Sequence, residues 1–264
     1  MLKGKAALVT GSTRGIGEAA ARALAAEGCN VMMCGFGNPD DIERKRAAIE
    51  ADTGVKVRYH NADLADADQL DDLARSVDAA FGSFDILVNN AVIRYFHTIE
   101  TFERDDWNHA LAVNLTAPFF LIQHALPGMR RRGWGRIVNM SSVMGLGARA
   151  GRADYITTKT GLLGLTRAVA AELRGAQNIT CNALCPGAVL TPNTEIKIAE
   201  LAQNEGLEFE QAKREYLARR GQITGYIEPD RVAKLIVYLC QDSSLDINGA
   251  AIPIDKGRAA AWLE

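Results

Sequence analysis

Short apolar segments alternate with longer amphipathic segments along the whole chain. The short ones have the length and composition of strands, and the long ones have the three-to-four-residue spacing of helices. The predicted strands are Ala6–Thr10, Asn30–Cys34, Val55–His60, Ile86–Asn89, Arg136–Met140, Ile179–Leu184 and Ala251–Ile254. The predicted helices are Ile16–Glu27, Pro39–Ala51, Ala67–Phe81, Arg104–Arg132, Asp154–Leu173 and Pro229–Gln241.

Strands that alternate with helices form a parallel sheet with helices on both faces. We therefore expect an α/β protein with a single doubly wound domain over residues 1–264 and a central parallel seven-stranded sheet. Residues 191–221 interrupt the alternation with a charged, helix-prone insert. Its position near the carboxyl ends of the strands favours a helical lid over a ligand pocket. A solvated pair of surface helices fits the same pattern.

Composition narrows the function classes. The 264 residues are 48% hydrophobic and 23% charged, with a net charge of −2, which is typical of a globular protein and gives no basic excess for nucleic acid. No apolar run approaches the roughly 18 residues of a membrane span, and the N-terminus has the pattern of a strand rather than a signal peptide. We expect a cytoplasmic protein without membrane or nucleic-acid partners. The scattered cysteines and histidines predict no metal site.

A glycine-rich segment, Thr10-Gly11-Ser12-Thr13-Arg14-Gly15-Ile16-Gly17, connects the first predicted strand to the first helix. Glycines at such a turn let the backbone approach a pyrophosphate at the positive end of the helix. Glycines also occur at helix starts for steric reasons, so the position between strand and helix carries most of the signal.

The end of the second strand bears on the choice of cofactor. Cys34-Gly35-Phe36-Gly37 lacks the acidic residue that often binds the adenosine ribose, and no lysine or arginine follows immediately. Arg14 is the side chain that could reach a 2′-phosphate. We expect NAD, and NADP stays open as the less favoured choice.

Tyr155-Ile-Thr-Thr-Lys159 places a phenol and an ammonium on one face of a helix. A fixed cation beside a phenol favours the phenolate form, so such a pair can exchange a proton with an alcohol or carbonyl near neutral pH. Taken alone, the pair could equally be an exposed surface pair. Ser142 emerges upstream at the end of a strand, and Asn114 lies within a long helix, where an amide needs a partner.

Together these motifs resemble the short-chain dehydrogenase/reductase family over nearly the whole chain. Asp63-Leu64 is similar to the family's adenine-contacting pair, Asn89-Asn90-Ala91 to its sheet-stabilising segment, and Cys185-Pro186-Gly187 with Thr191 to the stretch that holds the nicotinamide. The resemblance implies a Rossmann-type fold and cofactor contacts from Gly11, Thr13, Arg14, Gly15, Ile16, Gly17, Phe36, Asp63, Leu64, Asn90, Ala91, Tyr155, Lys159, Pro186, Gly187, Val189 and Thr191. Val92 departs from the glycine that the family usually has there.

The resemblance also implies the roles of a catalytic tetrad and an assembly. Lys159 holds the nicotinamide ribose, Tyr155 acts as acid and base, and Ser142 hydrogen-bonds the substrate oxygen. Asn114 anchors a water that links Lys159 to solvent. The family further implies a homotetramer built through the helices that contain Asn114 and Tyr155.

Within the family, Gly35–Pro39, Gly54-Val-Lys-Val and the charged insert look most like the NAD-dependent D-3-hydroxybutyrate dehydrogenases. The substrate pocket of that group is not reproduced, because Arg94, Met144, Arg152, Ala188, Lys197 and Arg258 replace its binding residues. Fewer aromatic rings and more guanidinium groups favour a larger, anionic or polyhydroxylated substrate. The expected substrate contacts are Arg94, Ser142, Met144, Arg152, Tyr155, Ala188 and Lys197.

We therefore expect an NAD-dependent enzyme that interconverts a secondary alcohol and a ketone through this tetrad, on a hydroxy acid or another anionic or polyhydroxylated small molecule. In one alternative, Arg94 and Arg152 lie at the rim of a pocket for a neutral sugar, polyol or cyclic alcohol. The arginines could also pair with Asp154 or Glu195 and never meet the substrate. A more remote alternative is a catalytically silent dinucleotide-binding protein, which we disfavour because Tyr155 and Lys159 are both present.

Overall fold

The computed structural model describes residues 2–175, 178–219 and 225–261. Seven parallel strands form one sheet in the order β3-β2-β1-β4-β5-β6-β7. Their bounds are β1 Ala6–Thr10, β2 Asn30–Cys34, β3 Val57–His60, β4 Ile86–Asn89, β5 Gly135–Met140, β6 Ile179–Pro186 and β7 Ala251–Ile254. The strand order reverses between β1 and β4, which is where open α/β sheets bind ligands.

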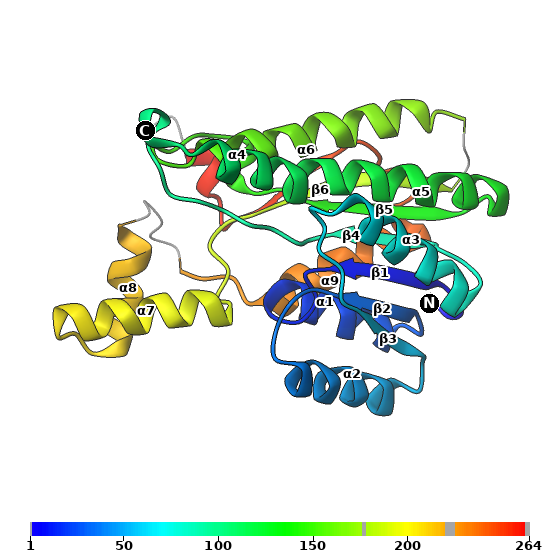
Figure 1. Ribbon diagram of the computed structural model, residues 1–264, viewed down its shortest axis with the longest axis horizontal. Helices are drawn as coiled ribbons and strands as arrows, with labels where there is room; N and C mark the ends of the chain where they lie inside the picture. Colours follow the sequence, from blue (N-terminus) through cyan, green and yellow to red (C-terminus); the bar gives the residue numbers. More distant parts are fainter. Residues whose placement is uncertain (1, 176–177, 220–224, 262–264) are drawn as a thin grey trace.

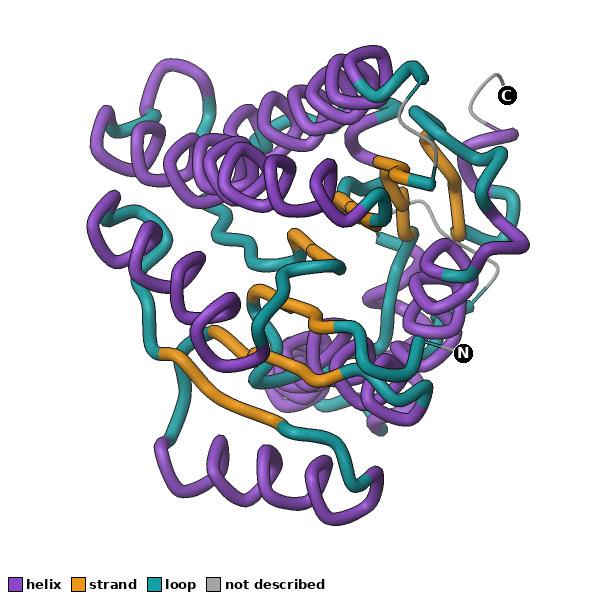
Figure 2. The backbone as a smooth tube through the Cα atoms, turned by 90° about the vertical axis from the view of Figure 1, so that its right-hand side faces the viewer, coloured by secondary structure: helices purple, strands orange, loops and turns teal. Residues whose placement is uncertain are grey.

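Helices cover both faces of the sheet (Figures 1 and 2). Their bounds are α1 Gly15–Ala26, α2 Pro39–Thr53, α3 Ala67–Phe81, α4 Arg104–Leu111, α5 Ala117–Arg132, α6 Ala153–Glu172, α7 Pro192–Glu205, α8 Phe209–Ala218 and α9 Pro229–Cys240. Because successive residues of a strand point to opposite faces, β1 contributes to two cores. Ala7 and Val9 pack with α1 and α9, whereas Leu8 packs with α3 and α5. This is the doubly wound arrangement that the alternation predicted.

Several elements differ from the prediction by two residues or more. Helix α2 ends at Thr53 rather than Ala51, and β6 ends at Pro186 rather than Leu184. The third strand starts at Val57 rather than Val55, because side chains replace the ladder at its beginning: Lys56 N donates to Asn30 Oδ1 and Val57 N to Glu50 Oε1. The long helix over 104–132 is interrupted by a π-helical segment, Ala112–Thr116, between α4 and α5. A single extra residue in the turn leaves no signature in the hydrophobic spacing.

The charged insert consists of α7 and α8, which project from one end of the sheet (Figure 1). Its two ends lie side by side, because Val189 and Ile227 form a parallel bridge in which Leu190 N donates to Ile227 O (2.9 Å). Residues 220–221 of the expected insert lie outside the described residues. The insert therefore leaves and rejoins the rest of the fold at neighbouring positions beside the strand ends. Its action as a lid stays a prediction.

One helical segment, Arg104–Arg132, is long and apolar enough to cross a membrane by length and composition alone, with a mean hydropathy of 1.3 over its best window. Of that window, 44% is buried inside the protein. Its buried residues, among them Leu121, Ile122 and Met129, pack with α3 and the sheet. Packing in the core explains much of its apolar character.

Candidate active site

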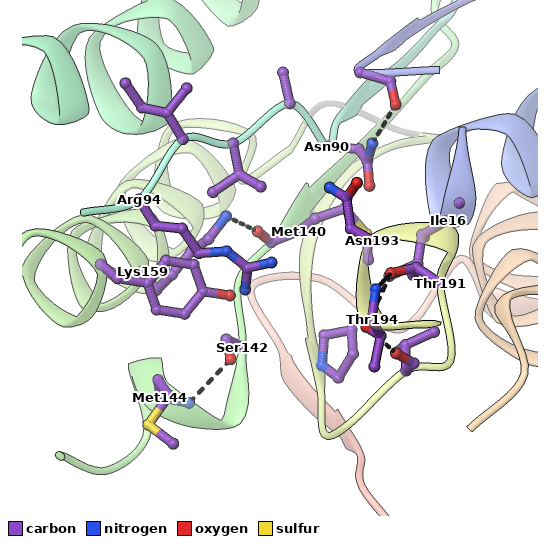
Figure 3. A pocket seen from close by; sticks show the side chains of 18 of the residues that line it. Ile16, Asn90, Arg94, Met140, Ser142, Met144, Lys159, Thr191, Asn193 and Thr194 are labelled. Atoms are coloured by element: carbon purple, nitrogen blue, oxygen red, sulfur yellow. Dashed lines mark hydrogen bonds between the residues drawn. The ribbon is translucent and has the colours of Figure 1, made fainter. Parts of the chain in front are cut away.

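A pocket of about 870 Å³ opens at the carboxyl ends of β1, β4, β5 and β6. It is large enough for a small ligand together with part of a cofactor. Of all the residues predicted for the site, only Gly17 and Asn114 do not line it. Figure 3 shows side chains from the glycine loop, β5, α6 and the start of α7 facing one space. Residues far apart in the sequence therefore meet where the strand order reverses.

The glycine loop lies directly against the end of β4. A Cβ on Gly11, whose φ is +63°, would lie 2.8 Å from Ala91 Cα, and a Cβ on Gly17 would lie 2.2 Å from Gly11 O. Asn90 Nδ2 donates to Thr10 O (2.9 Å) and Gly11 O (3.1 Å). Only glycine fits at positions this tight, so Gly17 and Asn90 hold the shape of the loop.

The glycines of the loop leave its backbone accessible at the amino end of α1, which begins at Gly15. Backbone N–H groups and the positive end of a helix are what a pyrophosphate needs. The residues present therefore fit a dinucleotide, with Phe36, Asp63 and Leu64 lining the same pocket beyond the loop.

Lys45 lies close to the glycine loop, although no sequence motif points to it. Its Nζ donates to Thr13 O (2.9 Å) and pairs with Glu18 and Asp41, each at 3.1 Å. Its charge is therefore already balanced by two carboxylates. Arg14 is exposed at the start of α1 and lines the pocket.

Tyr155 and Lys159 lie one turn apart on α6, with Lys159 Nζ 5.7 Å from the centre of the Tyr155 ring. Lys159 is only 2% exposed and donates to Met140 O at 2.6 Å. Burial, with a further contribution from the positive charge of Arg94, lowers the pKa of Lys159 to about 7. A buried amine resists protonation because its charged form would have no water around it.

Ser142 follows β5 and begins a short 3₁₀ helix, Val143–Gly145. Its Oγ accepts a hydrogen bond from Met144 N (3.1 Å), as Figure 3 shows. An acceptor bond leaves the hydroxyl proton of Ser142 available to a substrate oxygen. Ser141 Oγ donates to Lys159 O (2.8 Å), which ties this turn to α6 and fixes Ser142 relative to Tyr155.

Asn114 lies in the π-helical segment and is buried. Its Oδ1 accepts from Ile93 N (2.9 Å), and its Nδ2 donates to Ile93 O (2.8 Å). π-Helical turns often occur at functional sites, and this one directs an amide at a neighbouring backbone. Asn114 thus holds the segment that carries Arg94, and the water it was expected to anchor stays a prediction.

Arg94 and Arg152 lie beside Tyr155. Their Cζ atoms lie 5.8 Å and 5.1 Å from the centre of the Tyr155 ring, and Arg94 points into the pocket (Figure 3). Within the described part of the chain, no ion pair joins either guanidinium to Asp154 or to any other acid. Asp154 instead accepts a hydrogen bond from Tyr95 N (2.9 Å) through Oδ2.

Phe96 forms an apolar wall beneath these cations, and the sequence analysis did not single it out. Arg152 Cζ lies 4.1 Å and Lys197 Nζ 5.0 Å from the centre of its ring. Met144 and Ala188 line the pocket as well. A position five residues beyond the Asn89-Asn90-Ala91 motif gives no signal by itself, since the path of this loop depends on the Asn114 anchor.

No group of three or more histidine, cysteine, aspartate or glutamate side chains suited to a metal ion occurs among the described residues. The groups that face the pocket are a phenol, a buried ammonium, a hydroxyl and guanidinium groups. These can move a proton and bind an oxyanion, and the adjoining cradle can hold a dinucleotide.

The sequence model of short chain dehydrogenases matches residues 5–201. The chain belongs to the short-chain dehydrogenase/reductase family. Among its relatives is the D-beta-hydroxybutyrate dehydrogenase of Cupriavidus necator, 41% identical over 98% of this chain and 100% of the relative. The enzyme of that name in Rhizobium meliloti is 38% identical, over 97% of this chain and 99% of the relative. This short-chain dehydrogenase/reductase is thus an oxidoreductase similar to hydroxy acid dehydrogenases.

Solved structures extend the comparison. L-Sorbose reductase from Gluconobacter frateurii, in complex with NADPH and L-sorbose, has a TM-score of 0.92 and 28% identity over 97% of each chain. Levodione reductase has a TM-score of 0.87 and 28% identity over 98% of this chain and 99% of its own. The family binds a nicotinamide dinucleotide, and both named neighbours act as reductases.

Proposed function

We propose that this family member is an NAD-dependent dehydrogenase that interconverts a secondary alcohol and a ketone on a small anionic hydroxy acid. One observation carries the proposal: Arg94 and Arg152 flank the Tyr155 ring with no carboxylate partner among the described residues. Guanidinium groups bind carboxylates through paired hydrogen bonds. The hydroxybutyrate dehydrogenases among the relatives support the same substrate class.

In this proposal, the tetrad moves the proton. Tyr155 accepts the hydroxyl proton during oxidation and returns one to the carbonyl oxygen during reduction. The ammonium of Lys159 stabilises the phenolate, and the hydroxyl of Ser142 donates a hydrogen bond to the reacting oxygen. A bound nicotinamide supplies or accepts the hydride. Asn114 keeps the Arg94 segment in place without meeting the substrate.

The surroundings of the adenosine end favour NAD over NADP. No basic residue follows β2 directly, and Lys45 is engaged by Glu18 and Asp41. Arg14 is the cation in this region that could serve a 2′-phosphate. Since the L-sorbose reductase structure contains NADPH, the cofactor must be measured directly.

A neutral polyol or sugar is the second candidate substrate, favoured by the high structural similarity to L-sorbose reductase. In that case, Arg94 and Arg152 form a rim. The exposed side chain of Arg94 is compatible with this position.

A panel of hydroxy acids, sugar acids and polyols with NAD and NADP, followed by the absorbance of the reduced nicotinamide, tests the proposal. We expect the highest kcat/KM for a hydroxy acid with NAD. Arg94→Ala and Arg152→Ala should each lower kcat/KM for that acid, with little effect on neutral alcohols. The decrease should correspond to a loss of about 2–5 kcal/mol of transition-state binding energy. A polyol as best substrate, processed normally by both variants, would overturn the anionic assignment. A preference for NADP that Arg14→Ala abolishes would overturn the cofactor assignment.

A further inference from the structure

Four arginines line the substrate side of the pocket, two more than the proposed function uses. Arg94 follows β4, Arg149 and Arg152 precede α6, and Arg258 begins the C-terminal 3₁₀ turn, Arg258–Ala261. Figure 1 shows this turn, in red, beside the beginning of α6. Among the described lining residues, the only acid is Asp63, which follows β3 near the other end of the site.

The four guanidinium groups form a continuous row of like charges. Beyond the larger effect of burial, Arg94 and Arg149 both lower the pKa of Arg152. Arg149 likewise lowers the pKa of Arg258, again after burial. Each member is therefore close enough to the next to repel it, and the row is unfavourable until an anion enters.

Two acids among the described residues act on this row through space, without an ion pair to Arg152. Asp154 acts on Arg152, and Asp255 acts on Arg258. Both carboxylates also accept backbone hydrogen bonds: Asp154 from Tyr95 N, and Asp255 from Gly257 N (3.0 Å) and Ala259 N (2.6 Å). Among the described residues, two carboxylates therefore lie beside four guanidinium groups, and the row carries an excess of positive charge that suits an anionic ligand.

Not all N–H donors of these arginines have a hydrogen-bond partner. Arg152 Nε is buried and has no hydrogen-bond partner. Arg149 donates to Arg219 O (3.3 Å), a neutral carbonyl at the end of α8, and no carboxylate in the described part of the chain forms an ion pair with it. A buried donor without a partner costs free energy that a bound oxyanion would recover.

The cofactor does not explain the row. The amino end of α1, with Arg14, lies at the glycine loop and provides for the pyrophosphate there. The row instead extends from Tyr155, where the substrate reacts, toward the C-terminal turn and α8. Its charge therefore belongs to the substrate side.

We infer that the substrate is a dianion, a hydroxy or oxo dicarboxylate whose first carboxylate binds Arg94 and Arg152 and whose second binds Arg149 and Arg258. This inference rests on the proposed function, because it assigns a substrate class to the same pocket. In the oxidation, the alcohol carbon gives a hydride to NAD and the hydroxyl gives its proton to the phenolate of Tyr155. Loss of the hydride and the proton leaves a C=O bond on the substrate. Both carboxylates leave the reaction unchanged.

Calorimetric binding to the protein saturated with NAD tests the second anion site without turnover. The probes are succinate, glutarate, adipate and pimelate, each with its monomethyl ester, which keeps the length and removes one charge. For the best chain length, we expect the diacid to bind about tenfold more tightly than its half-ester. Arg149→Gln and Arg258→Gln should each reduce this ratio severalfold. Arg75→Gln, at an exposed arginine on α3 outside the pocket, should preserve it.

Turnover of 3-hydroxybutyrate and 3-hydroxyglutarate separates this inference from the proposed function. If diacids bind no more tightly than half-esters and neither variant changes the ratio, the second site is refuted, even where 3-hydroxybutyrate is oxidised. If the diacid preference and its dependence on Arg149 and Arg258 are found, the dianion site is supported. Failure to oxidise any hydroxy acid would then overturn the proposed function alone.

Discussion

Lys159 has almost no contact with water, and its ammonium donates a hydrogen bond to the carbonyl of Met140. The spacing of Tyr155 and Lys159 predicts that the two side chains share a helix face, and they do. It does not predict how deeply the ammonium is buried, because that depends on β5 and on the turn after Ser142. Nor does it show that Arg94, 65 positions earlier in the chain, acts on the same charge.

The pH dependence should reveal this coupling. The proposed mechanism requires protonated Lys159, so kcat/KM for ketone reduction should fall as the pH rises through the Lys159 pKa of about 7. Arg94 lowers that pKa, so Arg94→Gln should move the alkaline limb to higher pH. Arg94→Lys keeps the charge and should leave the limb near its wild-type position. A limb that is the same in all three proteins would show that Arg94 does not tune Lys159.

Among the elements, the strand-to-helix unit at the N-terminus was the most predictable. The glycine spacing and the apolar strand before it are local signals, and the observed β1 and α1 agree with the predicted bounds within a residue at each end. The π-helical turn around Asn114 was not predictable, since its amide finds its partner at Ile93, in another segment. Local patterns determine the elements, whereas long-range contacts determine their irregularities.

Two helical glycines provide a matched test of the loop's packing. Gly17→Ala would place a methyl group against Gly11 O and Asn90, so it should cost about 1–3 kcal/mol of stability and weaken NAD binding. Gly164→Ala, on α6 with no atom within 4 Å of the new Cβ, should stabilise the fold by up to about 1 kcal/mol. Thermal unfolding and cofactor titration measure both effects. Equal Tm and equal NAD affinity in the two variants would contradict the packing argument.

For the whole molecule, the parallel seven-stranded sheet and its two helical layers followed from the alternation of strands and helices, whereas the assembly did not. The homotetramer stays a prediction. Phe119 and Phe120 on α5 are 45% and 43% exposed in the single chain, and their rings pack edge to face at 5.2 Å. Large exposed aromatic side chains on one helix are typical of interfaces.

Light scattering should give four times the 28.5 kDa of one chain. Phe120→Lys should yield a smaller species, because a lysine cannot be buried there without a partner. Phe209→Lys is a matched control on α8, where the phenylalanine is also exposed, and it should leave the mass unchanged. A wild-type monomer would refute the expected assembly.

The most direct test of the whole account is Tyr155→Phe, which removes one oxygen atom from the centre of the pocket. With the best hydroxy acid and saturating NAD, we predict that the rate of nicotinamide reduction falls by about 10²–10⁴-fold, the usual contribution of general acid–base catalysis. The affinity for NAD should stay within a few-fold of wild type, because the glycine loop and its Asn90 contacts are untouched. Activity retained within tenfold of wild type would contradict the assignment of Tyr155 as the proton carrier.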